Sequence, residues 1–452
     1  MLSGLELSSS VALNIPEEEL EKSIALAVLT GLAVTSTASA QIEEIVVTAT
    51  KRASTLQEIP IAVSVTTSDT MEKANILDIN DLQSVVPSLR VSQLQNSTNT
   101  NFVIRGFGNG ANNPGIEPSV GVFIDGVYRS RSAAAISDLP KLERVEVLRG
   151  PQSTLFGKNA SAGVISVVTA KPSGERYGKV SATVGNFGAL NASAYYENAL
   201  SDTAAFSISA STNTRDGYST NLTTGSEIND RDRQAFRAQL VMSPGDNTEI
   251  RFIADYDTID ELCCAVVNLQ AGPTVPAINF AGGQIVANDP EALSFYSNSD
   301  TFNELDNSGI SMQIDHDFEN ITLTSITSFR NVDSYSNIDA DFTSADIIQN
   351  DIATDIDTFS QEIRLASTNG DKVDWMVGGY LFDESVDYTN NLPFGNGYRR
   401  YLDAISFGGV SAVEGILGLP FGTFGNPNSG VREESTLEND AISLFGSLDF
   451  HL

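Results

Sequence analysis

The feature that most constrains this chain is a two-residue alternation of apolar and polar side chains, which recurs from about residue 179 to residue 452. In one such run Phe236, Ala238 and Leu240 are separated by Arg237 and Gln239. Because successive side chains of a β-strand point to opposite faces, the run has one apolar and one polar face. Runs of about 10 residues with this pattern are typical of strands that cross an outer membrane. A soluble β-sandwich alternates in the same way, so periodicity alone leaves that alternative open.

The lengths of the connections favour a membrane barrel. Tight-turn signals occur at Ser201-Asp202, Pro244-Gly245-Asp246, Glu319-Asn320 and Asn369-Gly370, and long connections are expected near 259–307, 331–357 and 385–437. Alternating short turns and long loops is the asymmetry of outer-membrane barrels. We therefore predict a mainly β fold, in which an α+β domain precedes an incomplete antiparallel transmembrane β-barrel. We expect about ten strands, against the roughly 22 of plugged outer-membrane transporters.

The N-terminal residues have the pattern of an export signal. Lys22 precedes an apolar run from Ile24 to Val34, and the run is followed by Ala38-Ser39-Ala40. Such a run with a small-x-small site predicts cleavage before Gln41. Residues 1–21 contain five glutamates where a signal peptide is usually basic. We interpret them as an atypical acidic extension and infer that the true start lies close to Lys22.

The composition excludes several classes of function. A formal net charge of -32 argues against nucleic acid as a partner, since phosphates would be repelled. It indicates a solvated acidic exterior or a field that attracts cationic ligands. Two histidines, His316 and His451, are too few for most His-based metal or hydrolase sites, so we predict no enzymatic activity, no metal and no cofactor. The acidic stretch 333–357 is either a solvated loop or a calcium site, although its spacing matches no EF-hand.

The chain has two cysteines, Cys263 and Cys264, and they are adjacent. Two neighbouring cysteines exclude a disulfide scaffold. Three states remain open: a bond to a cysteine beyond residue 452, a vicinal disulfide, or free thiols. An exported location favours an oxidised form.

A short strand-forming segment follows the expected cleavage site. It consists of Glu44, Ile45, Val46, Val47, Thr48 and Ala49. Most of its residues are β-branched, and polar residues follow it. A terminal strand without a partner of its own suits β-strand addition to another protein. We call residues 44–49 the coupling segment.

Five motifs follow in order between residues 103 and 169. They are Val103–Gly108 (VIRGFG), Gly121–Tyr128 (GVFIDGVY), Glu143–Pro151 (ERVEVLRGP), Leu155–Gly157 (LFG) and Gly163–Thr169 (GVISVVT). Within the second motif, Asp125-Gly126 between apolar runs is a tight-turn signal. The motifs and their spacing resemble the plug domain of TonB-dependent outer-membrane receptors, and the coupling segment resembles the TonB box of that family.

The resemblance implies roles for particular residues. The coupling segment would pair with the periplasmic protein TonB, which transmits energy from its inner-membrane complex. Arg105 and Arg149 would pair with glutamates of the barrel wall and lock the plug in place, and Glu362 is an inward-facing candidate partner. A local salt bridge, for example with Glu146, is the alternative for these arginines.

The predicted domains are a signal peptide with its acidic extension (1–40), a TonB box segment (41–52), a plug (53–172) and a partial barrel (177–452). We expect active import of a scarce extracellular ligand, a ferric siderophore or other iron complex, across the outer membrane of a Gram-negative bacterium. The partners would be TonB, outer-membrane lipid and that ligand. A truncated remnant that does not transport, and a receptor for a vitamin or saccharide, are the alternatives. The residues that contact the ligand cannot be identified from the sequence.

Overall fold

A computed structural model describes residues 46–451, apart from residues 49, 53, 58, 75, 77, 95, 97–98, 110–114, 132–140, 287–288, 290, 369–371 and 428. The expected signal peptide lies outside the described residues, as do Glu44, Ile45 and Ala49 of the coupling segment. In the described part of the chain, no helix combines the length and apolar character needed to cross a membrane.

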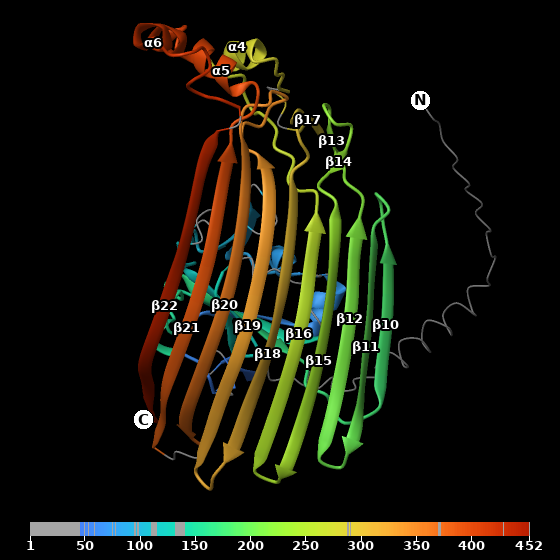
Figure 1. Cartoon of the computed structure of the whole chain (residues 1–452). Coiled ribbons are helices and arrows are strands. Elements are labelled where there is room, and N and C mark those ends of the chain that lie inside the picture. The colour runs from blue at the N-terminus through green and yellow to red at the C-terminus, as the bar shows by residue number, and fades with distance from the viewer. Residues whose placement is uncertain are drawn as a thin grey trace, which may run out of the picture. The chain divides into compact units, whose positions relative to one another are not determined.

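Ten strands form one large antiparallel sheet, which we call the wall (Figure 1). Each strand pairs with the wall strand that precedes it in the chain and with the one that follows. The strands are β10 (Tyr177–Val184), β11 (Leu190–Ser201), β12 (Ala204–Arg215), β15 (Arg231–Gly245), β16 (Thr248–Glu261), β18 (Phe302–Asp317), β19 (Ile321–Asp339), β20 (Gln349–Ser367), β21 (Val373–Pro393) and β22 (Gly430–Phe450). The prediction of a mainly β chain with about ten barrel strands is confirmed.

The two faces of the wall differ in chemistry as the alternation predicted. Phe236 and Phe252 are 49% and 38% exposed, whereas their chain neighbours Arg237 and Arg251 are 6% and 3% exposed. The apolar side chains therefore point away from the rest of the chain, and the polar ones are covered by it. A soluble sandwich has the opposite arrangement, with its apolar faces inside.

The three short turns that lie among the described residues are confirmed, but one long connection is not. The expected connection 331–357 is mostly strand, since β19 continues to Asp339 and β20 begins at Gln349, with Asp333 opposite Asp355. Beyond the apolar band the outward face of the strands is polar, as at Asp333 and Asp355, whereas Val332 and Ile356 are buried on the inward face. The apolar-out, polar-in alternation therefore stops while the backbone ladder continues. The prediction of a loop over this whole range was wrong, and residues 340–348 alone connect the two strands.

Smaller elements lie beyond the wall strands, at the end opposite the short turns (Figure 1). They are β13 (Ser219–Asn221), β14 (Glu227–Ile228), α4 (Val275–Phe280), β17 (Ser294–Phe295), α5 (Tyr398–Ile405) and α6 (Gly409–Leu417). Arg399 of α5 binds Glu414 of α6 at 2.8 Å. In the connection after β16, Cys263 and Cys264 form a vicinal disulfide, which decides among the three states left open by the sequence.

The elements that precede the wall form the plug. Its main sheet has five strands in the order β3 (Val63–Thr67), β8 (Leu142–Arg149), β9 (Gly163–Thr169), β6 (Val120–Ile124) and β7 (Val127–Arg129). Two small sheets pair β1 (Val46–Val47) with β2 (Ser54–Thr55), and β4 (Leu89–Gln93) with β5 (Thr100–Ile104). The helical elements are α2 (Ser68–Lys73), the 3-10 helix η1 (Ile79–Ser84) and α3 (Ser153–Phe156).

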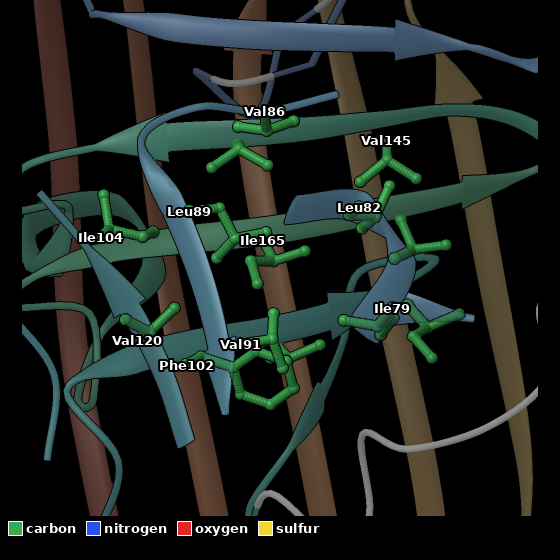
Figure 2. Packing of buried hydrophobic residues seen from close by; sticks show 14 of the residues in the cluster. Ile79, Leu82, Val86, Leu89, Val91, Phe102, Ile104, Val120, Val145 and Ile165 are labelled. Atoms are coloured by element: carbon green, nitrogen blue, oxygen red, sulfur yellow. The ribbon is translucent and has the colours of Figure 1, made fainter. Parts of the chain in front are cut away.

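The plug has its own apolar core (Figure 2). Figure 2 shows Leu82 of η1, Leu89 of β4 and Ile165 of β9 gathered in one cluster. The central strands are covered on both faces, which explains their nearly continuous apolar sequence. At the β6–β7 turn Asp125 and Gly126 have φ values of 49° and 78°, so both residues adopt the left-handed conformation that a tight hairpin of this type requires.

Candidate functional site

The described part of the coupling segment is folded against the plug. Val46 and Val47 pair with Thr55 and Ser54, and Val47 is fully buried. The backbone N–H of Thr48 donates to Oε1 of Glu146 at 2.8 Å. In this conformation the segment uses an internal strand partner, so pairing with another protein would require its release.

Two basic residues attach the chain after the coupling segment to the wall. Lys51 Nζ lies 2.5 Å from Glu362 Oε2 on β20 and within 5.2 Å of the centre of the Phe156 ring. Arg52 Nη2 donates to the backbone carbonyl of Ser367 at 2.7 Å and lies 3.1 Å from an Asp374 carboxylate oxygen on β21. Burial lowers the pKa of Lys51 and outweighs the opposing effect of Glu362.

The turn of the β6–β7 hairpin places a buried carboxylate between wall arginines. Asp125 accepts hydrogen bonds from Arg237 and from Arg251, the latter at 3.2 Å, and from the backbone N–H of Thr169 at 3.0 Å. Burial alone raises the pKa of Asp125, but the two guanidinium groups and Thr169 outweigh it and hold the pKa below its usual range. The carboxylate is therefore ionised, and it ties the plug to β15 and β16.

Among the described residues, three further ion pairs between buried side chains join plug and wall. Asp78 lies 3.0 Å from Arg233, Arg131 lies 3.2 Å from Glu384, and Arg129 lies 3.7 Å from Asp255. All six side chains are at most 12% exposed. We call these pairs, with Asp125 and its two arginines, the plug–wall seam. Removing one partner of a buried ion pair costs about 3–5 kcal/mol, because the other charge remains buried.

Arg105 and Arg149 lie outside this seam. Arg105 is exposed at a φ of 53°, and its backbone N–H donates to the carbonyl of Ser88. Arg149 is half-buried, with Nη2 lying 3.4 Å from the carbonyl of Val63. Within the described ranges neither forms an ion pair with a wall residue, and Glu362 is bound by Lys51 instead. Their locking role stays a prediction.

The sequence reasoning did not identify the residues of the seam. Asp125 was interpreted only as a turn residue, and Arg237 only as part of the polar face of its strand. The one available signal was a charged residue inside an apolar or glycine-rich run, as at Asp125, Arg129 and Asp78.

Residues 55–164 match the family model of the TonB-dependent receptor plug domain. The chain is 31% identical to the pesticin receptor of Yersinia pestis over 150 residues, which cover 32% of this chain and 22% of that receptor. It is 24% identical to the ferrichrome outer membrane transporter/phage receptor of Escherichia coli over 218 residues, which cover 47% and 28% of the two chains. The matched stretches thus span about a quarter of these curated relatives.

Solved structures with a similar fold include the ferric yersiniabactin uptake receptor of Yersinia pestis. The TM-score is 0.67 at 16% identity, over 87% of this chain and 62% of that one. The siderophore receptor PiuA of Acinetobacter baumannii has a TM-score of 0.63 at 14% identity, over 88% and 56% of the two chains. The plug-domain match, the curated relatives and the wall of consecutively paired strands show that the chain carries a TonB-dependent receptor plug domain, followed by a β-sheet with the fold of part of such a receptor's barrel.

Proposed function

We propose that the protein takes part in TonB-dependent active import of a ferric siderophore or other iron complex. Its similarity to relatives named as outer membrane proteins supports a location in the outer membrane of a Gram-negative bacterium. The observation that contributes most is that Val46–Thr48 of the coupling segment are held by the plug, while Lys51 and Arg52, a few residues later, are held by the wall. A pull on this segment would act directly on contacts between the two regions. The relatives named as ferrichrome and ferrioxamine B receptors support the choice of an iron complex as ligand.

The proposed domains are those of the sequence analysis: residues 1–40 as a removed signal, 41–52 as the TonB box segment, 53–172 as the plug and 177–452 as barrel. Residues 44–49 would pair with TonB by strand addition once Val47 and Thr48 leave their present partners. Energy would come from the inner-membrane complex that TonB belongs to. We propose no enzymatic activity, in keeping with relatives that are named as receptors and transporters.

We retain Arg105 and Arg149 as proposed lock residues, acting beside the seam. Both come from motifs that resemble the family's plug. Their polar ends are not engaged by the described wall strands, which leaves them available to other partners in the assembled protein.

Deletion of residues 44–49 tests the proposal. Cells that express the variant should bind a radiolabelled ferric siderophore at their surface and fail to accumulate it. Normal accumulation by the deletion variant would overturn the coupling role. If the unaltered protein accumulates no ferric complex but takes up another solute, the choice of iron complex is wrong and the coupling role remains.

A further inference from the structure

A cavity of about 340 Å³ lies between the plug and the inner face of the wall. On the wall side it is lined by strands β10, β11, β12, β15 and β16, where small hydroxyl side chains replace the large charged ones of the seam. These hydroxyls belong to Ser181, Ser193, Ser209 and Ser211. On the plug side it is lined by α2 and by the β6–β7 hairpin. The small side chains of the wall explain why the plug does not fill this space.

Arg129, the last residue of β7, lines this cavity although its side chain is only 4% exposed. Its Nε and Nη1 atoms have no hydrogen-bond partner among the residues that the structure describes. Its ion pair among the described residues joins Nη2 to Asp255 at 3.7 Å, beyond hydrogen-bond length. A buried donor without an acceptor is costly, so a built pocket with two such donors calls for an acceptor inside it.

Arg237 lines the same cavity, and its Nε also lacks a partner within the described ranges. The comparison with Arg251 is informative. Arg251 does not line the cavity, and its three guanidinium nitrogens all donate, to Gln239, Asp125 and Thr169. Within the described ranges, the two of these three arginines that line the cavity have unused donors, and Arg251 has none.

The charges around the cavity favour an anion. Lys141 and Lys179 line it together with Arg129 and Arg237, against the carboxylates of Glu72, Asp255 and Asp257. Glu72 is paired with Lys179 at 2.7 Å. Arg330 binds the Asp255 carboxylate at 2.7 Å and so offsets its charge. Guanidinium groups match the planar, paired acceptors of carboxylates and phosphates, and serine hydroxyls add neutral donors.

We propose that this cavity is a binding site for an oxyanion, held by Arg129 and Arg237 against the serine-lined wall. Its volume is near the lower end of small-molecule sites, roughly 300–1,000 Å³, so it suits a small acidic solute or one acidic group of a larger one. The proposal does not depend on import, because it concerns equilibrium binding between plug and wall. The oxyanion could be a free inorganic ion or the carboxylate of an organic acid.

Calorimetric titration of the purified full-length protein with sulfate, against chloride at matched ionic strength, tests the site. We expect saturable binding of sulfate and none of chloride. Arg129→Gln should weaken sulfate binding by about tenfold or more, the loss expected for a charged hydrogen bond. Arg432→Gln is the matched control, because Arg432 is 61% exposed on β22 and far along the chain from the cavity. It should leave the affinity unchanged.

A second variant separates binding from folding. Ser209 lies directly opposite Arg237 in the β12–β15 register, so Ser209→Phe would fill the cavity without changing any charge. It should abolish sulfate binding and leave the melting temperature close to that of the unaltered protein. Citrate in place of sulfate identifies the source: binding of both anions indicates an organic acid, and binding of sulfate alone a free inorganic ion. The proposal would be overturned if the unaltered protein binds neither anion, or if Arg129→Gln and Ser209→Phe bind sulfate as tightly as the unaltered protein does.

Discussion

The interior of the plug and the plug–wall seam are both buried, but they are built from opposite chemistry. Val145, Val147 and Ile165 in the plug interior are fully buried and apolar, whereas Asp125 and Arg251 in the seam are 9% and 3% exposed and charged. Opening an apolar core costs about 25 cal/mol of free energy for each Å² of apolar surface exposed to water. Charged side chains, in contrast, regain their hydration when they separate. We infer that the plug is built to move against the wall as a folded unit rather than to unfold.

Removing the charge of Asp125 should have the largest effect at the seam. Asp125→Asn keeps a residue that tolerates the left-handed turn but leaves Arg237 and Arg251 without their anion. We expect the docking of plug to wall to weaken by about 3–5 kcal/mol. Outer-membrane permeability to a large antibiotic should rise in cells that express the variant.

The control for this variant is Asp69→Asn. Asp69 pairs with Lys73 on α2, and the two side chains are 69% and 75% exposed. Exposed pairs contribute only about 0–1 kcal/mol, so permeability should not change. Equal permeability of the Asp125 and Asp69 variants would show that the seam does not hold the plug.

A substitution in the plug interior should act differently from one in the seam. Ile165→Ala should destabilise the plug by about 2–5 kcal/mol, because it leaves a cavity among fully buried neighbours. Limited proteolysis should then cut within the plug, whereas the plug of Asp125→Asn should stay resistant. Ile363→Ala, on the outward face and 51% exposed, serves as the control. Cleavage of the Asp125 variant inside the plug would contradict the distinction between the two regions.

Removing the attachment of Lys51 to the wall should have a smaller, local effect. Lys51→Met removes the contact with Glu362, which keeps Arg364 as a partner at 2.6 Å. A cysteine placed at Thr48 should then react with a maleimide about tenfold faster, as expected for one lost charged hydrogen bond. Lys171→Met removes an exposed pair instead and should leave the rate unchanged. An unchanged rate for both variants would mean that Lys51 does not restrain the coupling segment.

The sequence predicted what depends on local pattern and missed what depends on contacts between distant residues. The alternation at Phe236 and Arg237 correctly gave the two faces of a wall strand, and Asp125-Gly126 correctly gave a turn. The partners of Asp125 lie 112 and 126 residues away, and no periodicity links them. The cavity at Arg129 depends on small serine side chains on the wall strands, and the sequence pattern identifies these positions only as polar. The length of β19 was missed because hydrogen bonding continues where the apolar alternation stops.

A carboxylate at the outer end of the wall provides a contrast with Asp125 and the smallest predicted effect. Asp230 lies between β14 and β15 and accepts from the backbone N–H of Leu262 at 2.6 Å. Burial raises the pKa of Asp230 to about 6, and the negative charges of Glu261 and Asp260 add to the shift.

Because the pKa of Asp230 is higher in the folded state than the 3.8 of an ordinary aspartate, the charged form destabilises the fold. This destabilisation is present above pH 6 and disappears as the pH falls through 6 toward 4, the reverse of a carboxylate held by arginines. Asp230→Asn should therefore raise the melting temperature slightly at pH 7.5 and reduce the gain that the unaltered protein shows at pH 5. Since Asp230 is only half-buried, solvent screening limits the difference to less than about 1 kcal/mol. An identical pH dependence in both proteins would show that Asp230 is ionised without cost, as Asp125 is in the seam.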